Sequence, residues 1–177
     1  GPSLGSCKKF IGFIEIPRAA MVLAFPMDLS GKTILVTGAS GALGAELTNV
    51  LSSKGAKVLG TATNNESAGS IPAKAEVRLL LDFQEPDSIQ TLTDYLVAAS
   101  QVDGIINASG VVAFGPVSEL TVDTSRRLTA VNSQGPIQLI SQLFGKLKES
   151  SEAGNQPFVL NITGVVAETP MMGMAAY

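Results

Sequence analysis

The sequence predicts an α/β protein built on a doubly wound parallel sheet, and three observations support this. Residues Thr33 to Thr37 form an unbroken apolar and β-branched run, the composition of a strand buried on both faces. Three glycines spaced three apart follow this run directly, and a helical pattern begins after them. Further apolar runs then alternate with amphipathic segments along the chain, which is the order that βαβ units produce.

The glycines after the first predicted strand are Gly38, Gly41 and Gly44. Glycine lets the backbone turn sharply off a strand and lets a pyrophosphate approach without meeting a Cβ. The helix that follows, with Leu43 and Leu47 on its apolar stripe, offers unpaired N–H groups and a partial positive charge to that anion. A plain βα turn rarely needs three glycines at this spacing, so we favour a nucleotide-binding loop over a turn that binds nothing.

The other elements follow in chain order. Lys54-Gly55 has the form of a helix end. Residues 64–73 are polar and contain Gly69 and Pro72, which predicts a loop or a poorly formed helix. Asp87 is placed as the N-cap of the third helical segment, and Asn132 is expected to interrupt a later helix. Strands are expected at 57–63, 76–81, 102–106 and 158–163, and the later helices at 87–99, 121–131 and 137–147.

The helix expected at 137–147 has more apolar surface than packing on one side requires. Its inward stripe is predicted to comprise Ile137, Ile140, Phe144 and Leu147, with Leu139 and Leu143 widening it. The sequence leaves two interpretations open, a deeply buried helix or a subunit interface.

Composition excludes several function classes. The net charge of −3 and the scattered Lys and Arg residues argue against nucleic acid or an anionic membrane as the main partner. No apolar segment reaches the length of a membrane span. The single cysteine, Cys7, excludes an internal disulfide framework and suits a cytoplasmic protein. Because there is no histidine, a His-based triad and His-ligated metals are excluded, and no metal site is predicted.

Residues 1–20 are expected to lie outside the fold. Gly1-Pro2-Ser3 resembles the scar of a cleaved expression tag, and the apolar piece that follows is too short and interrupted for a signal peptide. We therefore predict a tag or disordered extension at 1–20 and one nucleotide-binding domain at 21–177.

Several motifs in order resemble the short-chain dehydrogenase/reductase family. Residues 37–44 resemble that family's cofactor loop, and residues 107–110 look like a variant of its NNAG motif. Asp82 falls where such enzymes hold the adenine, Asn132 matches their structural and proton-relay asparagine, and Tyr177 matches the catalytic tyrosine. The resemblance runs from about residue 29 to residue 177, implies a Rossmann fold, and in general texture is similar to β-ketoacyl-acyl-carrier-protein reductases.

The resemblance implies an NAD(P)-dependent oxidoreductase that transfers hydride between nicotinamide and a carbonyl or secondary alcohol of a small molecule. Tyr177 would donate a proton to the carbonyl oxygen, and Asn132 would hold a water in the proton relay. Tyrosine titrates near pH ~10, so it needs the positive charge that the family supplies from a lysine four residues later. A homo-oligomer, dimer or tetramer, is also implied. The implied cofactor-binding residues are Gly38, Ser40, Gly41, Leu43, Gly44, Thr63, Asp82, Phe83, Asn107, Ala108, Ser109 and Gly110.

Three features depart from the family pattern. Ala42 stands where glycine is commonest, and the resulting GxxGxxG spacing also resembles epimerases and dehydratases that hold NAD tightly. Gly164 occupies the position of the substrate-orienting serine, and the adjacent Thr163 points to the other face unless the strand end bulges. The printed chain ends at Tyr177, so we expect a truncated form of a longer protein, with the fold incomplete at its C-terminus. Gly164 keeps a second hypothesis open, a nucleotide-binding protein with weak or no redox activity.

The predicted cofactor is NADP or NAD, with a mild preference for NADP. An acidic residue at the end of the second strand would bond the ribose 2′-hydroxyl and favour NAD. This sequence has Thr61 to Asn64 there, with no carboxylate to repel a 2′-phosphate. However, the arginine that many NADP-using relatives carry in the glycine loop is Gly41 here, which makes the preference mild.

Overall fold

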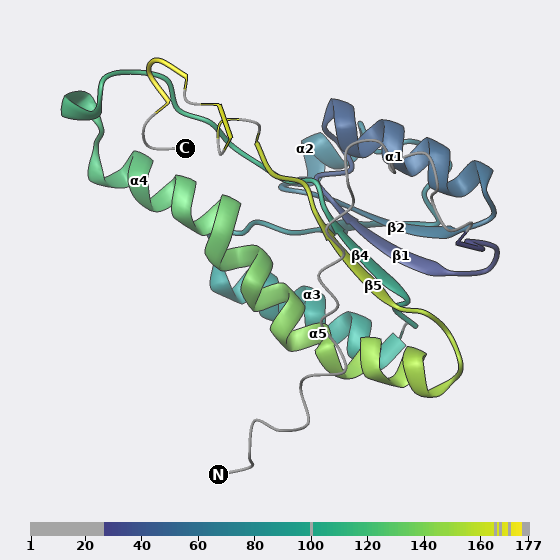
Figure 1. Cartoon of the computed structure of the whole chain (residues 1–177). Helices are drawn as coiled ribbons and strands as arrows, with labels where there is room; N and C mark the ends of the chain where they lie inside the picture. The colour runs from purple at the N-terminus through teal and green to yellow at the C-terminus, as the bar shows by residue number, and fades with distance from the viewer. Residues whose placement is uncertain (1–26, 100, 165, 167, 170, 175–177) are drawn as a thin grey trace, which may run out of the picture.

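The computed structural model describes residues 27–99, 101–164, 166, 168–169 and 171–174. The predicted extension at 1–20 and Tyr177 lie outside the described residues. In the described part, one five-stranded sheet lies between two layers of helices (Figure 1). None of the described helices is long and apolar enough to cross a membrane.

All neighbouring strands pair in parallel, in the order β3-β2-β1-β4-β5. This confirms the predicted doubly wound α/β class. The direction of winding reverses between β1 and β4, and ligands of such sheets bind at this switch point, outside the carboxyl ends of the strands. The strands are β1 Thr33–Thr37, β2 Lys57–Ala62, β3 Val77–Leu80, β4 Gly104–Asn107 and β5 Phe158–Asn161.

The helices follow the predicted order, with two differences in detail. Asp87 lies inside α3 and is not its N-cap, because that helix begins one residue earlier at Pro86, a residue suited to a first helical turn. A short 3₁₀ turn, Val117–Glu119, was not predicted. The helices are α1 Ala42–Ser53, α2 Asn65–Ala68, α3 Pro86–Ala99, α4 Val122–Thr129 and α5 Gly135–Glu152.

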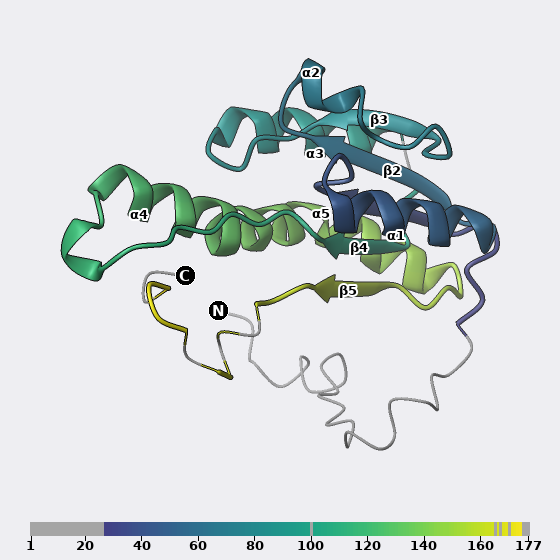
Figure 2. The same cartoon turned by 90° about the horizontal axis from the view of Figure 1, so that it is seen from above.

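The strand side chains alternate between two apolar clusters, one on each face of the sheet. Ile34 and Val36 pack toward α1 and α2, whereas Leu35 packs toward α3 and α5. All three are fully buried. This explains why the sequence shows continuous apolar runs, because a strand covered by helices on both faces needs an apolar residue at every position. Figure 2 shows the two helical layers from above.

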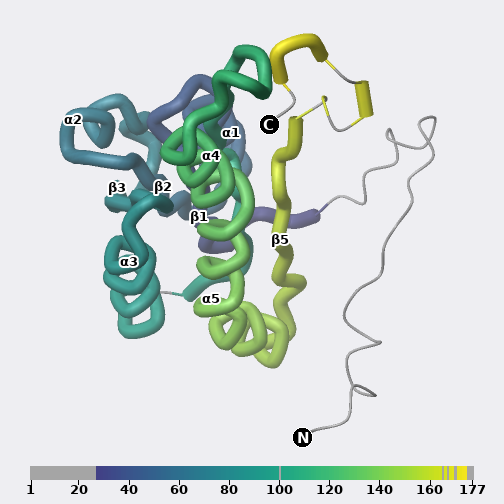
Figure 3. The backbone as a smooth tube through the Cα atoms, turned by 90° about the vertical axis from the view of Figure 1, so that its left-hand side faces the viewer, coloured from purple at the N-terminus to yellow at the C-terminus, as the bar shows by residue number. Residues whose placement is uncertain are grey.

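Asn132 does not end the helix that precedes it, so this prediction was wrong. A π-helical turn, Ala130–Gln134, joins α4 to α5, and the three form one continuous rod (Figure 3). The wider turn absorbs an extra residue, which allows the helix to pass Gly135-Pro136 without a break. The rod extends α4 beyond the carboxyl ends of the strands.

The inward face of α5 also differs from the prediction. Leu139, Leu143 and Leu147 are buried against the sheet, whereas Ile137 and Phe144 are 64% and 56% exposed. Both stripes have helical spacing and similar hydropathy, so the sequence pattern could not distinguish them. The docking of α5 against α3 and β4 selects the leucine stripe.

Candidate functional site

A cleft of about 260 Å³ lies at the switch point, outside the carboxyl ends of the strands. The structure brings eight of the implied cofactor-binding residues to its walls: Gly38, Gly41, Thr63, Asp82, Phe83, Ala108, Ser109 and Gly110. Four others, Ser40, Leu43, Gly44 and Asn107, are not among the residues that line it.

The glycine loop is shaped by backbone contacts that exclude side chains. Gly38 has a φ of +67°, which L side chains rarely adopt, and a Cβ there would lie 2.9 Å from Ser109 Oγ. A Cβ on Gly44 would lie only 2.2 Å from the Gly38 carbonyl oxygen. Gly44 therefore acts behind the cleft, by letting α1 pack closely on the loop.

The N-terminus of α1 has the properties of an anion site. Gly41 is its N-cap and supplies no side-chain hydrogen bond, and no acidic residue stands in the first turn. The first N–H groups of α1 therefore have no side-chain acceptor within the described part of the chain. Together with the helix dipole they favour a negatively charged ligand at this end of the cleft.

Thr37, at the end of β1, ties the loop after β4 to the glycine loop. Its buried hydroxyl oxygen accepts hydrogen bonds from the backbone N–H groups of Ala108 (3.2 Å) and Ser109 (3.1 Å). These two hydrogen bonds fix the position of the loop after β4 relative to the glycine loop after β1.

The loop after β3 forms another wall. Asp82 Oδ1 accepts a hydrogen bond from the Gln84 backbone N–H at 2.9 Å, so the carboxylate helps to shape its own loop. Phe83 is 6% exposed, and a Cβ on Gly135 would lie 2.4 Å from the Phe83 ring. The absence of a side chain at Gly135 lets this ring pack against the start of α5.

The side chain of Asn132 is hydrogen-bonded to the loop after β4. Its Oδ1 accepts a hydrogen bond from the Val111 backbone N–H at 2.9 Å, and its Nδ2 donates to the Val111 carbonyl at 2.8 Å. Both polar ends of the amide are therefore engaged with one residue. The side chain fixes the position of Val111, which lines the cleft.

A second cavity of about 240 Å³ lies beside the first, between the ends of β4 and β5 and the start of α5. Asn107 lines it, is 4% exposed, and donates from Nδ2 to Asn161 Oδ1 at 2.7 Å, while its own Oδ1 has no partner among the described residues. Thr163 lines this cavity together with Asn132. Gly164 is half-buried and offers no hydroxyl.

Arg127 and Val131 also line the first cleft, and sequence reasoning missed both. They stand four residues apart, so they share a face of the α4–α5 rod. That spacing was visible in the sequence, but nothing there indicated which face would turn toward the glycine loop. Arg127 is the only cationic residue among the described residues that line the cleft, and Asp82 is the only anionic one.

Residues 32–177 match the family model described as short chain dehydrogenase. The chain belongs to the short-chain dehydrogenase family. It is 29% identical over 160 residues to D-threitol dehydrogenase of Mycolicibacterium smegmatis, covering 86% of this chain and 60% of that protein. It is 35% identical over 89 residues to 3-oxoacyl-acyl-carrier-protein reductase of Escherichia coli, covering 48% of this chain and 36% of the reductase.

Solved short-chain dehydrogenase structures show the same architecture. A metagenomic short-chain oxidoreductase in complex with NADP superposes with a TM-score of 0.74 at 28% identity, covering 85% of this chain and 70% of that one. The chain thus spans 70% of the metagenomic oxidoreductase and 60% of the threitol dehydrogenase. Both the family and the Rossmann fold implied by the motifs are confirmed.

Proposed function

We propose that this short-chain dehydrogenase is an NAD(P)-dependent oxidoreductase that acts on a carbonyl or secondary alcohol of a small molecule. The observation that carries the proposal is the open N-terminus of α1 beside the glycine loop, inside a cleft at the switch point of the sheet. It supplies donors for a pyrophosphate and no side chain that would block one. The NADP complex of the metagenomic relative supports the same assignment.

The residues present fit a dinucleotide. Gly38 and Gly41 would receive the pyrophosphate, Thr63 the adenosine ribose, and Asp82, Ala108, Ser109 and Gly110 the adenine side of the cleft. When bound, the nicotinamide supplies or accepts the hydride. Tyr177 is proposed as the proton donor at the substrate oxygen. Asn132 is proposed to act as a positioning residue through its two bonds to Val111.

We propose NADP as the preferred cofactor, with NAD as the alternative. Thr63 stands at the end of β2 and lines the cleft, and no carboxylate from β2 reaches it. Among the described residues that line the cleft, the only carboxylate is that of Asp82, which follows β3, so β2 contributes no carboxylate that would repel a 2′-phosphate.

Binding of NADPH and NADH to the purified protein tests the proposal directly. We expect saturable binding of both by isothermal titration calorimetry, with NADPH the tighter ligand, and oxidation of NADPH with at least one member of a broad panel of ketones and aldehydes. Failure of both dinucleotides to bind at millimolar concentration would overturn the proposed function.

A nucleotide-binding protein without efficient redox activity is the second candidate, and Gly164 favours it. The position after β5 carries no hydroxyl to orient a substrate carbonyl. If this loss limits turnover, Gly164→Ser should raise the rate of carbonyl reduction by more than about tenfold, the value of one well-placed hydrogen bond. Gly145→Ser, at an open position in α5, is the matched control and should leave the rate unchanged.

An unchanged rate in Gly164→Ser would show that the missing hydroxyl is not what limits activity.

A third candidate, an epimerase or dehydratase with tightly held NAD, rests on the GxxGxxG spacing alone. It requires NAD to co-purify with the protein, which mass spectrometry of the denatured sample would detect.

We propose a cytoplasmic homo-oligomer, a dimer or tetramer, in which a second copy covers the outer stripe of α5. Ile137 and Phe144 expose large apolar surface on this helix, and an isolated helix face of this kind favours association. Phe144→Glu is expected to shift the mass measured by light scattering toward the monomer. An unchanged mass would exclude this stripe as the interface.

A further inference from the structure

Arg127 stands at the mouth of the nucleotide cleft, on a face of the α4–α5 rod that other residues locate. Gly135 packs on the Phe83 ring, and Val131, one turn earlier, is 8% exposed and lines the cleft. Arg127 follows one further turn toward the start of α4 and lines the same cleft. This face of the rod therefore runs along the loop after β3, and Arg127 lies at its outer end.

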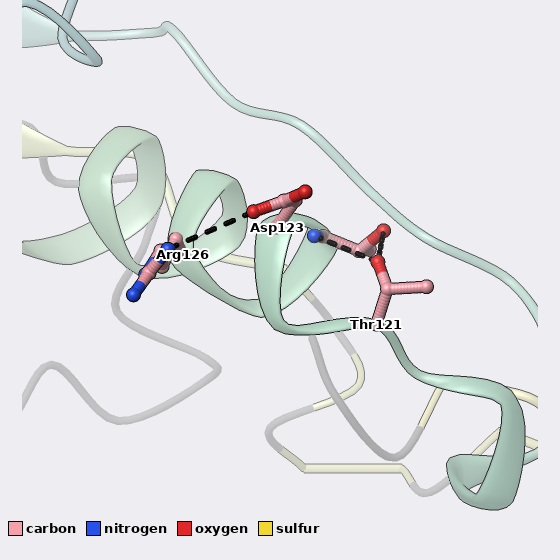
Figure 4. A network of polar contacts seen from close by, with 4 residues as sticks. Thr121, Asp123 and Arg126 are labelled. Atoms are coloured by element: carbon pink, nitrogen blue, oxygen red, sulfur yellow. Dashed lines mark hydrogen bonds and ion pairs between the residues drawn. The ribbon is translucent and has the colours of Figure 1, made fainter.

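The guanidinium of Arg127 makes no hydrogen bond or ion pair with the part of the chain that the structure describes. Its neighbour behaves differently. Arg126 pairs with Asp123 at 3.7 Å (Figure 4), and its side chain is 78% exposed. The two arginines are adjacent in sequence and share a helix, but only Arg127 reaches the cleft.

The surroundings of Arg127 indicate what kind of group it would bind. The donors for phosphate come from the glycine loop and the N-terminus of α1, whereas Arg127 comes from the α4–α5 rod. The lining residues linked to the same rod are apolar: Val131 belongs to it, Val111 is hydrogen-bonded to Asn132, and the Phe83 ring packs on Gly135. These side chains suit a flat, weakly polar ring. Asp82, the one lining carboxylate, is hydrogen-bonded within its own loop and forms no ion pair with Arg127.

A planar guanidinium stacks on aromatic rings and is less strongly hydrated than an ammonium group. We propose that Arg127 binds the adenine ring of the dinucleotide, closing the outer end of the cleft over the purine. This inference rests on the proposed function, because it requires an adenine nucleotide in the cleft. It assigns Arg127 a binding contact and no part in hydride or proton transfer.

A different role is suggested by a third cavity. Arg127 also lines a space of about 310 Å³ with Phe114, Val117 and Glu119. If the guanidinium served a substrate there, its removal would change the KM of that substrate and leave nucleotide affinity intact.

Calorimetric titration of four proteins with three ligands separates these roles. The proteins are wild type, Arg127→Gln, Arg127→Lys and the matched control Arg126→Gln. The ligands are NADPH, 5′-AMP and reduced nicotinamide mononucleotide, which lacks the adenosine. Because Arg127 is exposed, the variants should retain the wild-type melting temperature, and this is checked first.

We expect Arg127→Gln to lower the affinity for both NADPH and 5′-AMP by about three- to tenfold, the range for a partly exposed cation–π contact. The affinity for reduced nicotinamide mononucleotide should not change. Arg127→Lys should fail to restore affinity, because it keeps the charge and loses the plane. Arg126→Gln should match wild type with every ligand.

Wild-type affinity of Arg127→Gln for NADPH and 5′-AMP would overturn the inference and leave the proposed function standing. The inference would also be overturned if Arg127→Lys bound NADPH and 5′-AMP as tightly as wild type and the loss of affinity in Arg127→Gln disappeared at high salt. That pattern indicates a phosphate contact. If wild type binds none of the ligands, the proposed function itself fails, and the inference fails with it.

Discussion

Replacing Gly44 with alanine is expected to lower the free energy of unfolding by about 3 kcal/mol and to weaken NADPH binding by about a hundredfold. The added Cβ would lie 2.2 Å from the Gly38 carbonyl oxygen, 2.7 Å from the Gly38 carbonyl carbon and 2.8 Å from the Ala39 Cα. All three are backbone atoms, so no side chain can rotate away. The loop must move relative to α1, and this displaces the proposed pyrophosphate donors.

Gly145→Ala is the matched control for Gly44→Ala. Gly145 also lies in a helix, but nothing stands within 4 Å of a Cβ at that position. Alanine has the higher helix propensity, so this variant should gain stability, by up to about 1 kcal/mol. Urea unfolding and calorimetric titration of NADPH measure both effects. If the two alanine variants behaved alike, close packing of α1 on the glycine loop would not be required.

Asp103→Asn is expected to lower the free energy of unfolding by about 2–4 kcal/mol near neutral pH. Asp103 is 1% exposed at the N-terminal edge of the sheet. Its carboxylate accepts hydrogen bonds from the Thr33 backbone N–H at 2.8 Å, from Gln101 Nε2 at 2.7 Å and from Ser150 Oγ. It therefore joins the start of β1 to the end of α5. In an asparagine, an NH₂ group replaces one of the two accepting carboxylate oxygens. This group would face the N–H or O–H donor that the oxygen now binds, and that hydrogen bond would be lost.

The pH dependence of this cluster follows from the pKa of Asp103. Burial raises the pKa, but the hydrogen bonds from Ser150, Thr33 and Gln101, with the charge of Lys32, lower it below its ordinary value. A depressed folded-state pKa contributes stability above the unfolded pKa of about 3.9, and this contribution is lost as the pH falls through the folded value. The stability difference between wild type and Asp103→Asn should therefore shrink as the pH falls below about 4.

Urea unfolding of both proteins at a series of pH values measures this difference. Asp123→Asn is the control, because the Asp123 side chain is 95% exposed and pairs only with Arg126 among the described residues. Its effect should stay within about 0.5 kcal/mol at every pH. A difference between wild type and Asp103→Asn that stayed constant from neutral to acidic pH would contradict the assigned protonation behaviour.

The fold class was predictable because the signals that specify it are local. The run from Thr33 to Thr37 is apolar or β-branched at every position, the composition that suits a strand covered on both faces. The glycines at 38, 41 and 44 follow it where a parallel sheet turns into its first helix. Eight of the implied cofactor-binding residues lie in the loops that follow strands, and parallel strands bring those loops to one edge of the sheet.

Only the tertiary structure could establish which faces meet. Ile137 and Leu139 differ little in hydropathy, and the docking of α5 on the sheet buries one and exposes the other. Arg126 and Arg127 are identical in type, and the orientation of the rod sends one to solvent and the other to the cleft. Short-range periodicity identifies elements and their apolar stripes, but the choice between competing stripes depends on close packing between segments far apart in the chain.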